Sequence, residues 1–280
     1  MTKTRSLGRI LGVEVKIHGT FLLLLAFVAI SGLLKGGLLQ SGLSVTLSAV
    51  IFSVVVMHEF GHILAARRFG IKTKDVILSP LGGMARLEKL PDTPNQEIAV
   101  AAAGPAVNLV LAGLGFLAQP LFTGATLSGQ FLGALTGWFV TINLFLLGFN
   151  LIPALPMDGG RILRALLSKK MGHLKATQTA AKIARWTALL MALYAIYSAQ
   201  FMLLFIAGFI FVMSWVELFQ AKVRATQQNP AFQVFQTFQQ ARNQAQEAPF
   251  SSQVIDQDGN PVSGSNQGWS VKNIKWADQE

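Results

Sequence analysis

The residues most able to do chemistry in this sequence form the pentapeptide His58-Glu59-Phe60-Gly61-His62. Residues four apart lie on one face of an α-helix, so His58 and His62 can point the same way with Glu59 beside them. Two imidazoles at that spacing can bind one zinc ion, and the glutamate can then take a proton from zinc-bound water. Such short patterns also recur by chance. This one lies in an apolar run, where histidine and carboxylate side chains are costly and therefore indicate a function.

The composition places the chain in the membrane class. Of its 280 residues, 52% are hydrophobic and 13% are charged, and the mean hydropathy is +0.48. A soluble domain usually carries about a quarter charged residues. The net charge of +10 could indicate nucleic-acid binding, but the basic residues flank apolar runs instead of forming one stripe. We therefore expect no nucleic-acid partner and interpret the charge as membrane orientation.

The apolar runs predict an all-α polytopic membrane protein with about six transmembrane helices. The expected spans cover residues of about 20–34, 43–66, 98–117, 131–151, 186–199 and 201–215. Residues 1–18 are interpreted as a basic lead-in. A small membrane-associated β-hairpin is expected at about 74–88, after the second span, because Gly82-Gly83 separates two short apolar runs. The chain then divides into a membrane-embedded core, residues 1–220, and a polar cytoplasmic tail, residues 221–280.

The distribution of basic residues predicts the orientation of these spans. With the N-terminus in the cytoplasm, the cytoplasmic segments hold 22 of the 23 Lys and Arg residues, and only Lys35 lies outside. Cytoplasmic loops of membrane proteins carry such an excess of positive charge. We therefore expect both termini in the cytoplasm, and the pentapeptide near the cytoplasmic face.

A third metal ligand can be sought by elimination, since catalytic zinc usually has three protein ligands. The sequence has no cysteine, and the two remaining histidines, His18 and His173, lie in basic segments outside the spans. Asp158 lies in a segment broken by prolines and glycines, which membrane proteins tolerate only where the backbone is buried in protein or lines a polar cavity. We predict Asp158 as the third ligand. The alternative is a structural aspartate that pairs with Arg161 or caps the following helix.

Two asparagines are further candidates for the site. Asn150, eight residues before Asp158, could donate a hydrogen bond to a scissile carbonyl as negative charge develops there. Its alternative is an interhelical hydrogen bond worth about 0.6–2 kcal/mol. Asn108, in the segment GPAVN, raises the same question, and there we favour the interhelical bond. Gly104 and Pro105 are interpreted as allowing close helix packing.

Three motifs together resemble the site-2 proteases, a family of intramembrane zinc metalloproteases. They are HEFGH at 58–62, GPAVN at 104–108 and NLIPALPMDGGR at 150–161. The resemblance covers about residues 5–217 and implies one zinc ion per chain, held by His58, His62 and Asp158. It also implies that Glu59 is the general base. Many members carry a PDZ insertion or a CBS pair, and we expect neither in this sequence.

The resemblance further implies a zinc-dependent endopeptidase that cuts single-pass transmembrane proteins within or near their membrane helices. Its setting would be the lipid bilayer of the cell (inner or cytoplasmic) membrane, and the oligomeric state stays open. The alternative is a zinc-binding membrane protein that does not cleave, such as a transporter or a chaperone-like relative. Glu59 favours the enzyme, since a transport site needs no general base. The expected spans exclude a soluble zinc protease.

Overall fold

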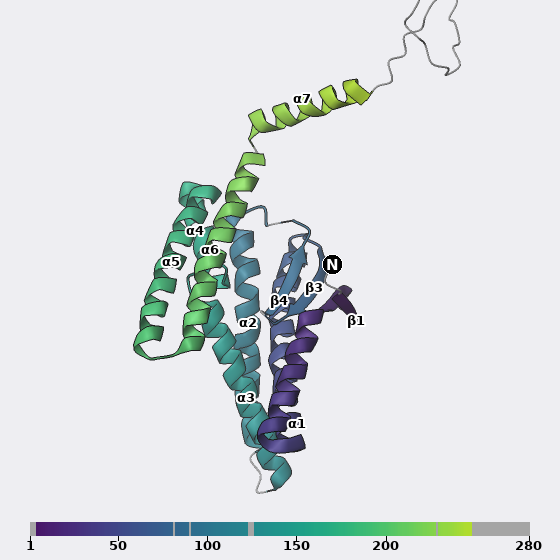
Figure 1. Cartoon of the computed structure of the whole chain (residues 1–280), viewed down its shortest axis with the longest axis vertical. Coiled ribbons are helices and arrows are strands. Elements are labelled where there is room, and N and C mark those ends of the chain that lie inside the picture. The colour runs from purple at the N-terminus through teal and green to yellow at the C-terminus, as the bar shows by residue number, and fades with distance from the viewer. Residues whose placement is uncertain (1–3, 81, 90, 123–125, 228, 248–280) are drawn as a thin grey trace, which may run out of the picture. The chain divides into compact units, whose positions relative to one another are not determined.

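Figure 1 shows the computed structural model, which describes residues 4–80, 82–89, 91–122, 126–227 and 229–247. Within these residues the chain is mainly helical, with one small β-sheet. It divides into two compact units, residues 1–225 and 226–280. The elements are β1 (Thr4–Ile10), β2 (Val13–His18), α1 (Gly19–Arg68), β3 (Thr73–Ser79), β4 (Gly82–Leu87), α2 (Pro94–Ala118), η1 (Gln119–Phe122), α3 (Leu127–Asn150), α4 (Asp158–Met171), α5 (His173–Tyr197), α6 (Phe201–Gln227) and α7 (Pro230–Glu247).

Helix α1 contains the first two expected spans within 50 residues and folds back on itself. Its helical conformation breaks at Gly36 and Gly37, and Gly37 takes a φ of 70°, a left-handed conformation that favours glycine. The Ser41 hydroxyl donates a hydrogen bond of 2.8 Å to the Ala29 carbonyl oxygen. Residues that far apart in a straight helix would be separated by about 18 Å. The helix therefore consists of two arms that meet at the two glycines.

Four helices among the described residues are long and apolar enough to cross a membrane: α1, α2 together with η1, α3 and α6. The expected count of six is not confirmed. Two expected spans fall within α1, and the expected span at 186–199 forms the C-terminal half of α5. Lys182 and Arg185 immediately precede that half, and they lower the mean hydropathy of the helix.

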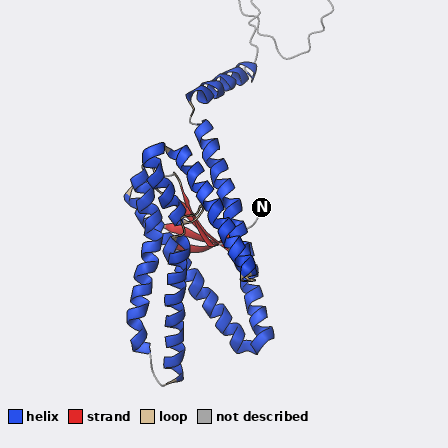
Figure 2. Cartoon of the chain, turned by 90° about the vertical axis from the view of Figure 1, so that its left-hand side faces the viewer, coloured by secondary structure: helices blue, strands red, loops and turns tan. Residues whose placement is uncertain are grey.

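The structure contains a four-stranded sheet in place of the isolated hairpin that the sequence predicts, shown in red in Figure 2. The strand order is β1-β2-β3-β4, with antiparallel β1/β2 and β3/β4 pairs and a parallel β2/β3 pair. Strands β3 and β4 form an antiparallel hairpin. The expected placement of a hairpin at the membrane stays a prediction. Strands β1 and β2 lie in the segment interpreted as a lead-in. Strand β4 is one edge of the sheet, so among the residues that the structure describes one side of its backbone has no partner strand.

The sheet packs against the part of α1 that carries the pentapeptide. Val13 and Val15 are buried, whereas Glu14 and Lys16 lie on the opposite face of β2, because side chains alternate along a strand. The buried cluster joins strands β2 and β3 to α1 through Val13, Val15, Phe60, Ile63, Val76 and Leu78. The helix that presents the two histidines is thus supported by the sheet on another face.

A buried carboxylate ties three strands together. Asp75 on β3 accepts a hydrogen bond of 2.8 Å from Lys16 Nζ on β2 and a bidentate contact from the Arg86 guanidinium on β4. The Arg86 guanidinium holds the pKa of the Asp75 carboxyl at about 2, well below its usual value. This ion cluster fixes the edge strand β4 relative to the rest of the sheet.

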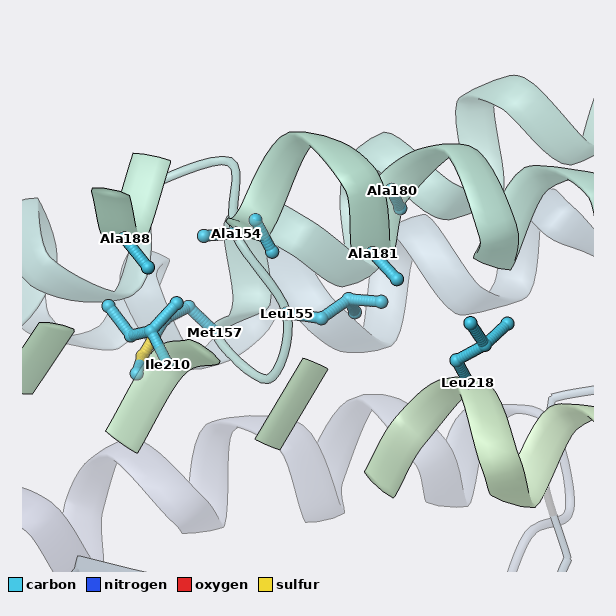
Figure 3. Close-up of a cluster of buried hydrophobic side chains, with 9 residues drawn as sticks. Ala154, Leu155, Met157, Ala180, Ala181, Ala188, Ile210 and Leu218 are labelled. Carbon is cyan, nitrogen blue, oxygen red and sulfur yellow. The ribbon is translucent and has the colours of Figure 1, made fainter. Parts of the chain in front are cut away.

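A second core encloses the loop between α3 and α4 (Figure 3). Leu155 and Met157 of this loop are buried against α5 and α6. Alanines line the facing side of α5, and their small side chains let the loop approach closely. The cluster consists of Ala154, Leu155, Met157, Ala180, Ala181, Ala184, Ala188, Ile210 and Leu218. The residue after this loop is Asp158, so packing of the loop positions that side chain.

Candidate metal centre

Three predicted ligands, far apart in sequence, meet at one buried point. His58 and His62 lie one turn apart on α1, and Asp158 is the first residue of α4. The His58 and His62 Nε2 atoms are 3.1 Å apart, and each lies 3.2 Å from Asp158 Oδ2. All three side chains are buried. Among the described residues they form the one group of His, Cys, Asp or Glu whose geometry could hold a metal ion.

The spacing of these three atoms fits a tetrahedral zinc ion. Zinc bonds of about 2.0–2.1 Å place tetrahedral ligand atoms roughly 3.3–3.4 Å apart. The observed separations of 3.1–3.2 Å are close to that value. Two neutral imidazoles and one carboxylate are also a donor set that zinc accepts, and three protein ligands leave a fourth position for water or substrate. The residues present therefore fit a catalytic zinc site.

Both histidines are oriented by hydrogen bonds from their other ring nitrogen. Nδ1 of His58 lies 2.8 Å from Oδ1 of Asn108, and Nδ1 of His62 lies 2.8 Å from the carbonyl oxygen of Val100. A carbonyl oxygen can only accept, so Nδ1 of His62 carries the proton; the Asn108 oxygen assigns the same tautomer to His58. Each Nε2 is then left with a free lone pair for a metal, the arrangement usual for metal-bound histidines.

Gly104 leaves the space that a metal ion needs. A Cβ atom added there would lie 2.3 Å from His62 Nε2 and 2.7 Å from His58 Nε2. Glycine therefore keeps open the position next to both ligand atoms. Asn108 makes interhelical hydrogen bonds, as the sequence predicts: one joins it to His58 on α1, and its Nδ2 donates one of 3.5 Å to the Asn143 carbonyl oxygen on α3. Gly104 likewise allows the expected close approach of α2 to α1. The sequence alone does not show that both residues lie beside the candidate metal ligands.

The start of α4 is embedded in the preceding loop, which fixes Asp158. A Cβ at Gly159 would lie 2.3 Å from the Leu151 carbonyl oxygen, and one at Gly160 would lie 2.4 Å from the Ala154 carbonyl carbon. Both glycines are required for this close approach of backbone to backbone. The alternative roles considered for Asp158 are not observed. Its ion pairs within 4 Å are with the two histidines, Arg161 acts on it only at longer range, and Met157 is the N-cap of the helix.

Glu59 faces the edge strand β4. Its carboxylate oxygen Oε2 accepts a hydrogen bond of 3.2 Å from the Ala85 backbone N–H. A Cβ at Gly83 would lie 2.7 Å from Glu59 Cγ, so glycine is needed for this approach. Glu59 thus directly follows His58 in sequence, and its side chain lies against the edge strand β4.

The structure places Asn150 at the end of α3 with its side chain turned to its own helix. Its Nδ2 donates a hydrogen bond of 3.0 Å to the Leu146 carbonyl oxygen. This bond is intrahelical, and it differs from the interhelical bond considered as the alternative. The oxyanion-binding role of Asn150 stays a prediction.

The fold and the site define a helical membrane protein with a buried group of two histidines and one aspartate that could hold a metal ion. The family model Peptidase family M50 matches residues 46–136 and 122–194, which together cover more than half of the chain. The chain therefore belongs to peptidase family M50 and, within it, to the site-2 proteases.

Similar proteins agree with this assignment. A zinc metalloprotease of Methanocaldococcus jannaschii is 37% identical over 205 residues, covering 73% of this chain and 58% of the relative. The stage IV sporulation protein FB of Bacillus subtilis is 31% identical over 145 residues, covering 51% of this chain and 48% of the relative. The chain thus spans about half to three fifths of the curated relatives it matches. The solved site-2 protease from Methanocaldococcus jannaschii aligns with a TM-score of 0.56 and 33% identity, over 77% of this chain and 95% of that structure.

Proposed function

We propose that this chain is a zinc-dependent intramembrane endopeptidase that hydrolyses peptide bonds within or near the membrane helices of single-pass proteins. The observation that carries the proposal is the triangle of ligand atoms from His58, His62 and Asp158, 3.1–3.2 Å on a side, with Glu59 next to it in sequence. The zinc-metalloprotease relatives support zinc, one ion per chain, as the metal.

We place the enzyme in the cell (cytoplasmic) membrane, with both termini in the cytoplasm. The uneven distribution of basic residues supports this orientation. Arg67 and Arg68 end the helix that carries the two histidines, so the site lies near a basic, membrane-surface end of α1. Water then needs only a short path to a site whose substrate lies in hydrocarbon.

In the proposed reaction the residues of the chain orient the substrate and move a proton. A bound zinc ion would polarise the scissile carbonyl and lower the pKa of a water molecule to about 7. Glu59 takes the proton from that water and later gives it to the leaving amine. The Ala85 N–H holds the Glu59 carboxylate in place before the substrate arrives. Asn150 is proposed to donate a hydrogen bond to the developing oxyanion, which requires its side chain to leave Leu146.

The edge strand β4 is proposed to receive the substrate. A helical substrate hides its peptide bonds, so the segment to be cut must unwind, and an unwound segment needs new hydrogen-bond partners. Strand β4 ends the sheet, and the Ala85 N–H points away from β3, towards Glu59. A substrate strand paired with this edge would therefore pass beside the proposed general base.

The alternative function is a zinc-binding membrane protein without cleavage, such as a transporter or a chaperone-like relative. Such a protein needs the three metal ligands but no base. Two observations favour cleavage over this alternative. Glu59 is present, and Gly83 makes room for its carboxylate beside an open strand edge.

The replacement Glu59→Gln separates the two functions. We expect the variant to keep its zinc, measured as metal per purified protein, and to lose cleavage of a model transmembrane helix by at least about 100-fold. Glu88→Gln, the same change at an exposed acid after β4, is the matched control and should cleave normally. If Glu59→Gln retains full cleavage, the proposed mechanism is refuted. If the wild-type chain binds zinc and cleaves no membrane helix, the alternative function is supported.

A further inference from the structure

A buried arginine lies outside the metal centre and joins three helices. Arg164 on α4 is only 6% exposed. Its Nε donates a hydrogen bond of 2.9 Å to Glu97 Oε1 on α2, and its Nη2 contacts the same oxygen. Its Nη1 lies 3.3 Å from Glu217 Oε2 on α6. The proposed reaction uses none of these three groups.

The pair formed by Arg164 and Glu97 connects α4, which carries Asp158, to α2, which contacts both histidines. Arg164 follows Asp158 by six residues on α4, a rise of about 9 Å. Glu97 lies one turn before Val100 on α2, and the Val100 carbonyl oxygen orients His62. One ion pair thus links the helix of the carboxylate ligand to the helix that supports the histidines.

We propose that Arg164 and Glu97 are positioning residues that set the distance between Asp158 and the two histidines. The proposal rests on the metal site proposed above and adds to it an ion pair that keeps Asp158 of α4 aligned with the two histidines of α1. An ion pair is suited to this task because it is directional. Both Nε and Nη2 of Arg164 converge on one carboxylate oxygen, which fixes the sliding and the rotation of α4 against α2.

Apolar contacts between these helices would hold them less specifically. The residues of α4 next to Asp158 are two glycines, which supply no side chain to lock the helix against α2. Removing the charge of Glu97 would leave the buried guanidinium with Glu217 as its charged partner, at 3.3 Å, so the ion pair would hold α4 to α6 and no longer to α2. Zinc sites tolerate changes of only about 0.2 Å in ligand distance, so even a small shift of α4 is expected to weaken zinc binding.

Glu217 provides a matched comparison. It contacts the same guanidinium at a longer distance, but it lies on α6, and no metal-ligand candidate or orienting residue lies on that helix. Removing its charge disturbs the same buried cluster without loosening the connection between α2 and α4. If the cluster serves only general stability, the two glutamates should behave alike. If it positions the ligands, only Glu97 should affect the metal.

The test uses the full chain in detergent micelles, with Glu97→Gln, Glu97→Asp and Glu217→Gln beside the wild type. Zinc affinity is measured by competition with a chelator, ligand geometry by the visible spectrum of the cobalt(II) form, and folding by thermal unfolding. We expect Glu97→Gln to weaken zinc binding about 10- to 100-fold, as for other partners that orient metal ligands, and to change the cobalt spectrum. Glu97→Asp keeps the charge but is shorter by one methylene, so it should fold and show a smaller change. Glu217→Gln should match the wild type in both metal measurements.

The outcomes separate this inference from the proposed function. If the wild type binds no zinc, the proposed function fails. If the wild type binds zinc and both Glu97 variants share its affinity and spectrum, the positioning role is refuted. Equal losses in Glu97→Gln and Glu217→Gln would also refute it, because they would show a general effect of the cluster. If Glu97→Gln does not fold, Glu97→Asp decides between these results.

Discussion

Filling the space at Gly104 is the most direct test of the metal centre. In Gly104→Ala the new methyl carbon would lie 2.3 Å from His62 Nε2 and 2.7 Å from His58 Nε2, where ordinary contacts are 3.4–4 Å. The rings would have to retreat by about 1 Å. The hydrogen bonds from the His62 Nδ1 to Val100 and from the His58 Nδ1 to Asn108 resist this movement. Because zinc–ligand distances tolerate only about 0.2 Å, we expect at least one histidine to be lost as a ligand.

The expected result is a loss of zinc affinity of at least about 100-fold, more than the 10- to 100-fold that losing an orienting partner costs. The backbone itself is not penalised, since alanine is favoured over glycine in helices by about 1 kcal/mol. The assay is zinc per protein after dialysis against graded chelator, together with thermal unfolding with and without zinc.

Gly113→Ala on the same helix is the matched control. A Cβ at that position meets nothing within 4 Å, so the variant should bind zinc normally and unfold at the same or a slightly higher temperature. The reasoning is refuted if Gly104→Ala binds zinc as tightly as Gly113→Ala. In that case the metal, if bound, would lie elsewhere.

The contacts of Asn108, Gly83 and Asp75 each give a further prediction. Asn108→Leu removes the acceptor for His58 Nδ1 and should weaken zinc binding about 10- to 100-fold, whereas Asn108→Asp retains an acceptor and should bind zinc nearly normally, both measured by chelator competition. Gly83→Ala places a Cβ 2.7 Å from Glu59 Cγ, so cleavage should fall at least about 10-fold while zinc content stays unchanged, and normal cleavage would contradict the assigned place of the base. The pKa of Asp75 is lowered to about 2, so its contribution to stability is complete above about pH 4 and is lost as the pH falls through about 2. Thermal unfolding should show this loss, on the order of 1–2 kcal/mol after screening of its half-exposed arginine partner, and Asp75→Asn should lack it.

The three candidate ligands that the structure brings together could be identified from sequence, because the prediction depends on residue type and spacing. His58 and His62 follow from the helical repeat, and Asp158 follows from the absence of other donors in broken apolar segments. The interhelical hydrogen bond of Asn108 and the packing role of Gly104 could be predicted, but not that both face the two histidines, because that depends on which helix lies opposite, and hydrophobicity does not determine it. A usable signal was present: the two residues are four apart, the same spacing as the two histidines.

The sheet was predicted only in part, for a different reason. Val13, Val15 and Ile17 alternate with Glu14 and Lys16, which is a strand pattern, but the segment's basic charge suggested a membrane lead-in. Its parallel pairing with β3 joins residues about sixty positions apart across the whole of α1. No local pattern encodes such a contact, so the sheet order required the structure.

The packing of α1 against α2 and the proposed metal centre depend on the same residues. Val100, Gly104 and Asn108 are successive four-residue steps on one face of α2, and they meet His58 and His62 on one face of α1. The two helices run in opposite senses at this contact, because the earlier histidine meets the later residue of α2 and the later histidine meets the earlier one. Gly104 lies between the other two residues and lets the imidazole rings approach α2. The oxygens of Asn108 and Val100 on either side each orient one ring. Any change that separates α1 from α2 therefore removes the orientation of both histidines together, so loss of metal and loss of helix packing should be strongly coupled here.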